Sequence, residues 1–595
     1  MSNSLNALPH NPPGLSPRLT AILAAYKEKQ LGKIPIITES SESSESSETI
    51  SEPILSIPSP NHSESESALT QTTDKAGNLI TYNSKQQEFI NLALSGQSCI
   101  LIGAAGTGKT TCMKGVIQAL IQAGKLPPLK SHSHKHLPHS APGIAVSAYT
   151  RRATNNIRRN MSEDLKSNCL TIHKLLEYAP VFYEEFDEKT GKIKNTMRFE
   201  PGRNSHNPLP SGVQVIVLEE ASMIAVELYN QVHSANVSES QYIFLGDIQQ
   251  LPPVFGSAIL GYKLLELPTV ELTEVYRQAL ESPIIKIAHR ILSGKPIPLI
   301  EFPAWTYPGQ LKLHPWKKKI SADSATRTLA KFFVGYTDSK GIFHKGALQK
   351  GTYNPETDAI LIPFNKACGT IELNNHIANR IAKINSKPVY EMIHGFKKSY
   401  YSIGDKTLYD REDAIITNIY ANPEYSGASP QSESVSLNYW GHKERKIGEI
   451  QPTHTGDEHD IDVLLRQVSE NTGDDDTVRA ASHIIELLLI DSETTIRIKD
   501  AGQLNSLILG YAITVHKAQG SEWDKVFVCF HQSHATMIQR ELLYTAITRA
   551  KKELFIICEA DTFEKGIMNQ RIKGDTLAEK AIYFQGKLDK GELQS

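Results

Sequence analysis

The sequence CILIGAAGTGKT, at residues 99–110, decides the fold class. Its first five residues form a continuous apolar run, which is typical of a strand buried on both faces of a parallel sheet. Residues 103–110, GAAGTGKT, match G-x-x-x-x-G-K-[ST] and precede the helical run CMKGVIQALIQAG. A glycine-rich turn between a buried strand and a helix N-terminus lets backbone amides surround phosphate groups. The stretch therefore predicts an α/β domain with a phosphate-binding loop.

The side chains of this loop complement its backbone. Lys109 supplies a cation for the transferring phosphoryl group, and the hydroxyl of Thr110 is suited to ligate Mg²⁺. The motif therefore predicts ATP and Mg²⁺ as cofactors. The residues expected to bind the nucleotide here are Gly103, Ala104, Ala105, Gly106, Thr107, Gly108, Lys109, Thr110 and Thr111.

Two further apolar runs end in side chains that suit ATP hydrolysis. Glu219 and Glu220 follow the run at 213–218, and Gln250 follows the run at 241–246. An isolated pair of glutamates is usually a solvated turn, but these follow a buried strand. Ligands of parallel sheets bind at the carboxyl ends of the strands. We predict that Glu219 holds Mg²⁺, that Glu220 activates water and that Gln250 hydrogen-bonds the γ-phosphate.

The apolar runs fall into two groups separated along the chain, so two parallel-sheet domains flanked by helices are expected. The first group comprises residues 99–103, 143–148, 213–218 and 241–246, and the second comprises 359–364, 525–530 and 554–559.

Composition limits the functions that are open to the chain. Its 595 residues carry 63 Lys and Arg against 65 Asp and Glu, a formal charge of −2, which excludes binding of polyanions by bulk charge. Any nucleic acid must therefore be held in a local groove. No apolar run approaches the roughly 20 residues that span a bilayer, so no membrane association is expected. The six scattered cysteines indicate neither disulfides nor a structural zinc site.

The first 78 residues differ from the rest. Residues 39–68 are rich in Ser and Glu and contain no Lys or Arg, a composition that favours disorder. Ahead of them, residues 16–31 have the spacing of a short amphipathic helix. This helix is expected either to fold back on the body or to dock a protein partner.

Further motifs follow in order between Tyr82 and Ala550: YNSKQ, SAYTRRAT, TIHKLL, ELTEVYRQ, AITVHKAQGSE and LLYTAITRAKK. Together with the phosphate-binding loop they resemble the superfamily-one DNA helicases of the RecD/Dda/Pif type. The segment that marks the Pif branch is not apparent, so the RecD and Dda side is the better comparison. The resemblance implies two RecA-like motor domains that move on single-stranded DNA.

The resemblance also implies roles for single residues. Gln86 would read the adenine, and Arg277 and Arg549 would reach the γ-phosphate from across the cleft. Gly520 and Glu522 would bind the nucleotide within the motif that couples it to DNA. The residues implied in DNA contact are Thr150, Thr171, His173, Thr514 and His516. The implied activity is ATP-dependent 5′→3′ movement on single-stranded DNA and unwinding at single-strand/duplex junctions, in replication, recombination or repair. The motor is expected to be monomeric and cytoplasmic, either with the nucleoid or, for a viral chain, in the host cytoplasm.

Two insertions complete the expected organisation. Alternating residues around the turn at 187–191 predict a β-hairpin, which relatives use as a strand-separating pin. The segment YSIGDKTLY resembles the start of a small SH3-like insertion in RecD-like helicases. The expected domains are a disordered tail at 1–78, a first RecA-like domain at 79–275 with the hairpin at about 179–204, a second RecA-like domain at 276–385 and 506–595, and the small SH3-like domain with long loops at 386–505.

Two functions other than that of a helicase share part of this pattern. The family usually has Asp where this chain has Glu219, which leaves open a catalytically weak DNA-binding scaffold that keeps the fold. A P-loop kinase or small-molecule ATPase would share the phosphate-binding loop, but it would not account for the segments TVHKAQGSE and YTAITRAKK.

Overall fold

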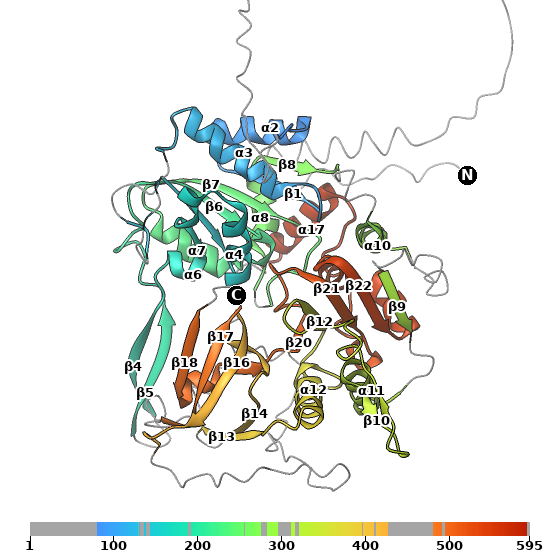
Figure 1. Cartoon of the computed structure of the whole chain (residues 1–595). Coiled ribbons are helices and arrows are strands. Elements are labelled where there is room, and N and C mark those ends of the chain that lie inside the picture. The colour runs from blue at the N-terminus through green and yellow to red at the C-terminus, as the bar shows by residue number, and fades with distance from the viewer. Residues whose placement is uncertain are drawn as a thin grey trace, which may run out of the picture.

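The computed structural model describes residues 80–591 apart from short gaps and one long one (Figure 1). The expected N-terminal tail and its helix lie outside the described residues. Across the described part of the chain, no helix has both the length and the apolar character needed to cross a membrane. The gaps are 129, 131, 133–135, 139–142, 188–191, 255, 275–281, 296–310, 316–319, 395–396, 410–411, 426–479 and 491–493.

The first sheet has six parallel strands in the order β3-β2-β6-β7-β1-β8. The four runs predicted as buried strands form its centre, which confirms that part of the sequence analysis. The strands are β1 (Cys99–Gly103), β2 (Gly143–Ala148), β3 (Cys169–Thr171), β6 (Val213–Glu219), β7 (Gln241–Gly246) and β8 (Thr269–Leu272).

Both faces of this sheet are buried because successive side chains point to opposite sides. In β1, Cys99 and Leu101 join one core while Ile100 and Ile102 join the other. The helices that supply side chains to these two cores include α2 (Ser84–Leu94), α3 (Lys109–Gln122) and α4 (Arg151–Asn160) on one face, and α7 (Val226–Ala235) and α8 (Ile259–Glu266) on the other.

The C-terminal helix α17 (Leu577–Asp589) corrects one expected boundary. We expected all of residues 506–595 in the second domain, yet Phe584 belongs to the core of the first sheet, and α17 lies against α8. A Cβ atom at Gly261 would lie 2.2 Å from the Phe584 ring, so only glycine allows this approach. The apolar periodicity of α17 is visible in the sequence, but periodicity does not tell which sheet a helix covers.

The second sheet has five parallel strands in the order β20-β12-β21-β22-β9. Its three central strands are those predicted. The strands are β9 (Leu311–Pro315), β12 (Asp358–Ile362), β20 (Ala512–Thr514), β21 (Trp523–Cys529) and β22 (Ala550–Cys558). The helices around it are α10 (Pro283–Leu292), α11 (Ala322–Val334), α12 (Thr370–Ile384), α15 (Arg540–Ile547) and α16 (Ala560–Met568).

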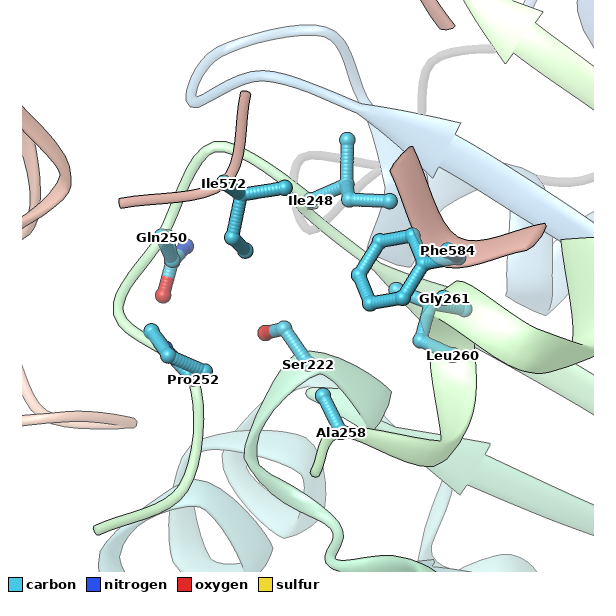
Figure 2. Close-up of a pocket in the computed structure, with 9 residues that line it drawn as sticks. All are labelled: Ser222, Ile248, Gln250, Pro252, Ala258, Leu260, Gly261, Ile572 and Phe584. Carbon is cyan, nitrogen blue, oxygen red and sulfur yellow. The ribbon is translucent and has the colours of Figure 1, made fainter. Parts of the chain in front are cut away.

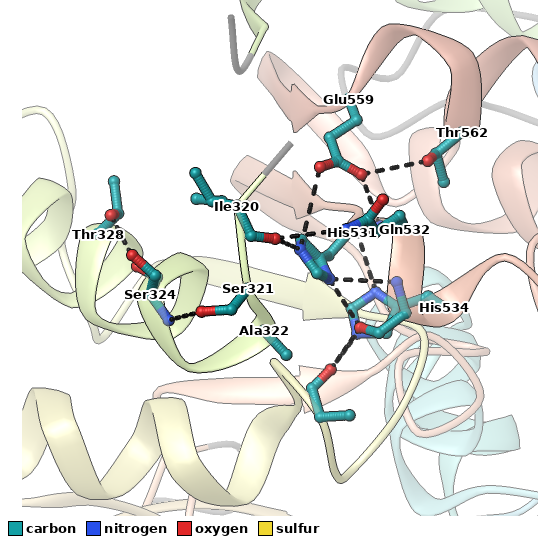
Figure 3. Close-up of polar contacts among 12 residues, drawn as sticks. Ile320, Ser321, Ala322, Ser324, Thr328, His531, Gln532, His534, Glu559 and Thr562 are labelled. Carbon is teal, nitrogen blue, oxygen red and sulfur yellow. Dashed lines mark hydrogen bonds and ion pairs between the residues drawn. The ribbon is translucent and has the colours of Figure 1, made fainter. Parts of the chain in front are cut away.

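Buried polar side chains fix the loops at the carboxyl edge of the second sheet (Figure 3). The His531 ring lies 2.8 Å from the carbonyl oxygen of Ile320, and a Glu559 carboxylate oxygen accepts from the Gln532 amide at 2.7 Å. His534 contacts the carbonyl of Ala367 at 3.1 Å, and burial lowers its pKa to about 4. His534 is therefore neutral at physiological pH, and the cluster is a structural brace for these loops.

The third sheet is antiparallel, with the order β18-β17-β16-β15-β19. It lies within the region where the sequence predicts a small inserted domain, and its SH3-like character stays a prediction. The strands are β15 (Lys406–Tyr409), β16 (Glu412–Ala421), β17 (Ala480–Leu489), β18 (Thr495–Asp500) and β19 (Leu507–Leu509), with α14 (Ala501–Asn505) and the hairpin β13 (Tyr390–His394) and β14 (Lys397–Tyr401) beside them.

The predicted hairpin is present in the first half of the chain. Strands β4 (Ala179–Asp187) and β5 (Lys192–Glu200) pair antiparallel from Ala179 opposite Glu200 to Asp187 opposite Lys192. They pair only with each other among the described strands, and they project from the first sheet as a separate ribbon (Figure 1). The Arg198 guanidinium lies over the Tyr183 ring at 5.6 Å near the base of the ribbon.

Candidate nucleotide site and interdomain contacts

The phosphate-binding loop joins β1 to α3 in the way the sequence predicts. Gly106 and Gly108 have φ of +82° and +83°, a left-handed conformation that glycine adopts without strain. The Thr107 hydroxyl donates to the carbonyl of Ala104 at 2.9 Å and braces the loop from within. Lys109 Nζ donates to the carbonyl of Gly103 at 2.6 Å. The ammonium group is thus folded over the loop, at the place where phosphate oxygens would lie.

The two glutamates lie at the end of β6 beside this loop. Glu219 Oε1 accepts from the Thr110 hydroxyl at 3.4 Å, and Glu219 Oε2 accepts from the Glu220 backbone amide at 3.0 Å. Burial and, after it, the neighbouring Glu220 charge raise the pKa of Glu219 to about 7, with Lys109 opposing the rise. A carboxylate and a hydroxyl in contact are hard oxygen donors of the kind that Mg²⁺ prefers. Thr110 and Glu219 therefore fit a bound Mg²⁺.

Glu220 has the geometry of a residue held ready for a ligand. Its φ of +52° is unusual for a residue with a side chain and turns the chain sharply at the end of β6. Its Oε2 atom is buried and finds no hydrogen-bond partner among the described residues. An unsatisfied buried carboxylate oxygen is costly unless a further group satisfies it. A water molecule attacking the nucleotide would supply that group.

Gln250 lies in the loop after β7 and is buried, with 4% of its surface exposed. Its Oε1 atom has no hydrogen-bond partner within the described part of the chain, and the same holds for the Ser222 hydroxyl. Figure 2 shows both side chains at a small cavity that Phe584 closes from the opposite side. Gln250 and Ser222, which lies three residues after Glu219, thus line the same cavity. The expected contact of Gln250 with the γ-phosphate stays a prediction.

Of the two arginines expected to reach the γ-phosphate, the structure describes one. Arg277 lies outside the described residues. Arg549 is buried, and its guanidinium donates to the carbonyls of Thr545 at 3.0 Å and Ser521 at 3.3 Å. In this conformation Arg549 is held within the second sheet's own loops.

Known families and proteins resemble the chain along most of its described length. A family model described as an AAA domain matches residues 86–256, and one described as a UvrD-like helicase C-terminal domain matches residues 509–557. The ATP-dependent RecD2 DNA helicase of Deinococcus radiodurans is 25% identical over 500 residues, which are 82% of this chain and 51% of that protein. The ATP-dependent DNA helicase Dda of Enterobacteria phage T4 is 24% identical over 505 residues, 76% of this chain and 93% of the relative.

The chain is thus similar, along most of its described length, to ATP-dependent DNA helicases of the RecD2 and Dda kind. It spans about half the length of RecD2. Among solved structures, a Pif1 helicase from Candida albicans covers 86% of this chain with 16% identity and a TM-score of 0.39.

Gln86, expected to read the adenine, is a buried helix-capping residue. Its side-chain oxygen accepts from the Asn83 amide at 3.1 Å, while the Asn83 side chain accepts from the Gln86 amide at 2.8 Å. This reciprocal pair is a capping box that starts α2. The role of Gln86 toward adenine stays a prediction.

Gly520 and Glu522 lie where the second sheet meets α4 of the first. Gly520 has φ of +72°, and a Cβ there would lie 2.8 Å from the Thr150 hydroxyl. Asn156 donates to the carbonyl of Gly520 at 3.0 Å. Glu522 pairs with Lys551 at 3.5 Å. These contacts set both residues at the joint between the sheets, and their expected part in nucleotide binding stays a prediction.

The first-sheet residues expected to touch DNA also shape the local backbone. The hydroxyls of Thr150 and Thr171 cap α4 and the short helix α6 (Ile172–Leu175), accepting from Ala153 and Lys174 amides at 3.1 and 3.2 Å. The ring of His173 lies 4.9 Å from the ring of Tyr178. Capping uses one lone pair of each hydroxyl and leaves room for a further contact.

The second-sheet pair expected to touch DNA is less accessible. Thr514 is buried at the end of β20, and its hydroxyl accepts from the Lys517 amide at 3.3 Å. Burial, with a smaller contribution from the nearby Arg571, lowers the pKa of His516 to about 4. His516 is therefore a neutral imidazole at physiological pH, and any contact it makes with a phosphate is a hydrogen bond without charge.

A buried cluster that the sequence did not indicate joins all three sheets, and we call it the three-way junction. Asp413 of β16 forms ion pairs with Arg152 of α4 and, at 3.7 Å, with Lys406 of β15. The Arg152 guanidinium lies 5.0 Å from the centre of the Trp523 ring in β21. Burial alone would raise the pKa of Asp413, but Arg152 and Lys406 hold it below its usual range. The junction comprises Arg152, Lys406, Asp413 and Trp523.

Proposed function

We propose that the chain is an ATP-dependent DNA helicase that hydrolyses ATP to move on single-stranded DNA and to unwind duplex DNA. The observation that carries the proposal is the grouping of Lys109, Thr110, Glu219 and Glu220 on one wall of the contact between two parallel-sheet bodies. A site between two bodies can convert hydrolysis into relative motion, because the nucleotide contacts both walls in one state and not in the other.

Each side chain has a definable task in this reaction. Lys109 would leave the carbonyl of Gly103 and bind phosphate oxygens. Glu220, with its buried and unsatisfied oxygen, would accept a proton from the attacking water. Bound Mg²⁺, held through Thr110 and Glu219, would neutralise charge on the phosphates. Arginines such as Arg549 would have to turn toward the phosphates when the two sheets close on ATP.

Lys109→Ala tests the proposal. The wild-type chain should show ATPase activity that single-stranded DNA stimulates, and the variant should lose it while remaining folded by circular dichroism. A strand-displacement assay with 5′- and 3′-tailed duplexes measures unwinding and its direction, for which we propose 5′→3′. Absence of DNA-stimulated ATPase in the wild type would instead favour the scaffold, for which the raised pKa of Glu219 is the supporting observation.

A Glu220→Gln variant separates binding from chemistry. Removal of a general base costs about 10²- to 10⁴-fold in turnover. The variant should bind ATP with affinity within a few fold of wild type and hydrolyse it at that much lower rate. Normal turnover would assign the base to another residue.

The β4–β5 hairpin supports a finer proposal, that it separates the strands ahead of the motor. It pairs with no other described strand and extends away from the first sheet. A variant with residues 186–193 replaced by a short turn should keep DNA-stimulated ATPase and lose unwinding. Retained unwinding would contradict this role.

We also propose a cytoplasmic location, work in replication, recombination or repair, and an N-terminal helix that docks a protein partner.

A further inference from the structure

Leu251, the residue after Gln250, is hydrogen-bonded to residues of the second-sheet domain through both its backbone amide and its backbone carbonyl. The Leu251 amide donates to the Thr545 hydroxyl at 2.9 Å, and the Leu251 carbonyl accepts from Gln519 Nε2 at 2.7 Å. Thr545 lies in α15, and Gln519 lies in the turn after β20. The loop that carries Gln250 is thus attached to the second sheet by its backbone.

The start of the same loop is attached by the neighbouring residue of α15. Tyr544 donates its hydroxyl to Asp247 Oδ2 at 2.6 Å and accepts from the Ala105 amide at 2.8 Å. Burial raises the pKa of Tyr544 well above its ordinary value, so the hydroxyl stays protonated and remains a donor. Tyr544 therefore ties both the Gln250 loop and the phosphate-binding loop to the second sheet.

These contacts are shielded from water. Leu251 and Thr545 have no exposed surface, and Gln519 has 3%. Within such a site, a hydrogen bond that is lost cannot be replaced by solvent, so its geometry is enforced. We call Gln519, Tyr544 and Thr545 the Gln250 clamp.

We propose that Gln519 and Thr545 are positioning residues that set Gln250 against the nucleotide according to the position of the second sheet. The inference rests on the proposed function and adds a route for DNA stimulation. Gln519 belongs to the turn between Thr514 and Gly520, the segment expected to face DNA. A displacement of that turn by DNA would move the Leu251 carbonyl, and Gln250 is bonded directly to Leu251.

A purely structural role for the clamp predicts a different result. Loss of packing would lower stability and the affinity for ATP together. Loss of positioning would lower the turnover number in the presence of DNA and leave the KM for ATP nearly unchanged. The split between kcat and KM therefore distinguishes the two roles.

The test compares Thr545→Val with Thr545→Ser in DNA-stimulated ATPase assays. Valine keeps the shape of the side chain and removes the acceptor for the Leu251 amide, whereas serine retains it. Thr545→Val should lower DNA-stimulated kcat about tenfold or more with the KM for ATP within about threefold, and Thr545→Ser should restore most of it. Gln519→Met is a second variant, which leaves the Leu251 carbonyl without its donor and should lower kcat in the same way.

Thr326→Val is the matched control. Thr326 is buried in α11, and its hydroxyl donates to the Ala322 carbonyl at 2.9 Å within the same helix. Its activity should equal that of wild type. The outcome is read only when wild type and Thr326→Val are both active. The inference is then overturned if Thr545→Val and Gln519→Met keep full stimulation by DNA, or if their KM for ATP rises in parallel with the loss of kcat. An inactive wild type would overturn the proposed function instead.

Discussion

The Gln250 clamp and the three-way junction both join the first sheet to the second, but they use opposite kinds of contact. Three of the four hydrogen bonds of the clamp join neutral groups and involve the backbone, and the fourth runs from the Tyr544 hydroxyl to the Asp247 carboxylate. The junction is built on buried charges from three sheets. A neutral hydrogen bond is worth about 0.5–1.5 kcal/mol net, whereas a buried charge that loses its partner costs about 3–5 kcal/mol.

This difference bears on how the two sheets can move. A displacement too small to admit water would leave Arg152 or Asp413 unpaired in a dry environment, which is expensive. The same displacement at the clamp breaks mainly hydrogen bonds between neutral groups, each of which costs less to lose than a buried ion pair. Phosphate oxygens of a bound nucleotide can then accept from the freed Ala105 amide. We therefore expect movement to open the contacts near the nucleotide while the junction stays closed and acts as a pivot.

The largest expected effect is at the junction. Asp413→Asn leaves Arg152 and Lys406 buried without their anion and should lower the free energy of unfolding by about 3–5 kcal/mol. Urea denaturation measures this change in the free energy of unfolding. Asp323→Asn is the control, because the exposed Asp323–Arg327 pair contributes at most about 0.5 kcal/mol. A loss at Asp413 no greater than that of the control would remove the contrast between the joints.

Tyr544→Phe should have a smaller effect on stability. It leaves the Asp247 carboxylate and the Ala105 amide without their shared partner, which costs about 1–3 kcal/mol. Thermal unfolding with and without nucleotide measures the change. Nucleotide should restore part of the loss, because its phosphates can satisfy the amides of the loop; an equal loss in both conditions would show that the contact does not respond to the ligand.

The pKa of Glu219 predicts a pH dependence for Mg²⁺. Its folded pKa of about 7 lies above the ordinary value, so the carboxyl is protonated below pH 7 and must lose that proton to bind a metal. The Mg²⁺ concentration for half-maximal ATPase should rise about tenfold per pH unit below pH 7 and level off above it. Glu219→Gln should lack this slope, and a wild-type curve that is flat from pH 6 to 8 would contradict the prediction.

The smallest expected effect is at an exposed charge pair in the third sheet. Arg497 contacts Glu486 at 2.8 Å with 71% of its side chain exposed. Arg497→Gln should change the free energy of unfolding by less than about 1 kcal/mol, and 0.5 M salt should remove the difference. A loss as large as that of Asp413→Asn would show that burial is not what separates the two kinds of ion pair.

Much of the fold could be predicted because buried parallel strands leave a strong local pattern. The runs that became β1, β2, β6 and β7 were recognisable as strands, and their order along the chain placed Glu219 near Thr110. Short edge strands such as β8 and β20 carry too few apolar residues to stand out.

The contacts between sheets could not be predicted from local patterns. Tyr544 and Thr545 read as ordinary helix residues, and only the packing of α15 shows that they reach Asp247 and Leu251, almost 300 positions earlier. Asp247 alone offered a signal, since it directly follows a buried strand as Glu219 does. The charge pairing of Arg152 with Asp413 was likewise invisible, because the two lie on different sheets.

The return of α17 to the first sheet has a consequence for biosynthesis. Phe584 completes one core of the first sheet, and the last strand of that sheet, β8, ends at Leu272. The ribosome must therefore add about 300 more residues, roughly 15–60 s of translation, before that core can close. During this interval the surface of α8 around Gly261 is uncovered on the nascent chain, so the first domain to be synthesised is among the last to finish folding.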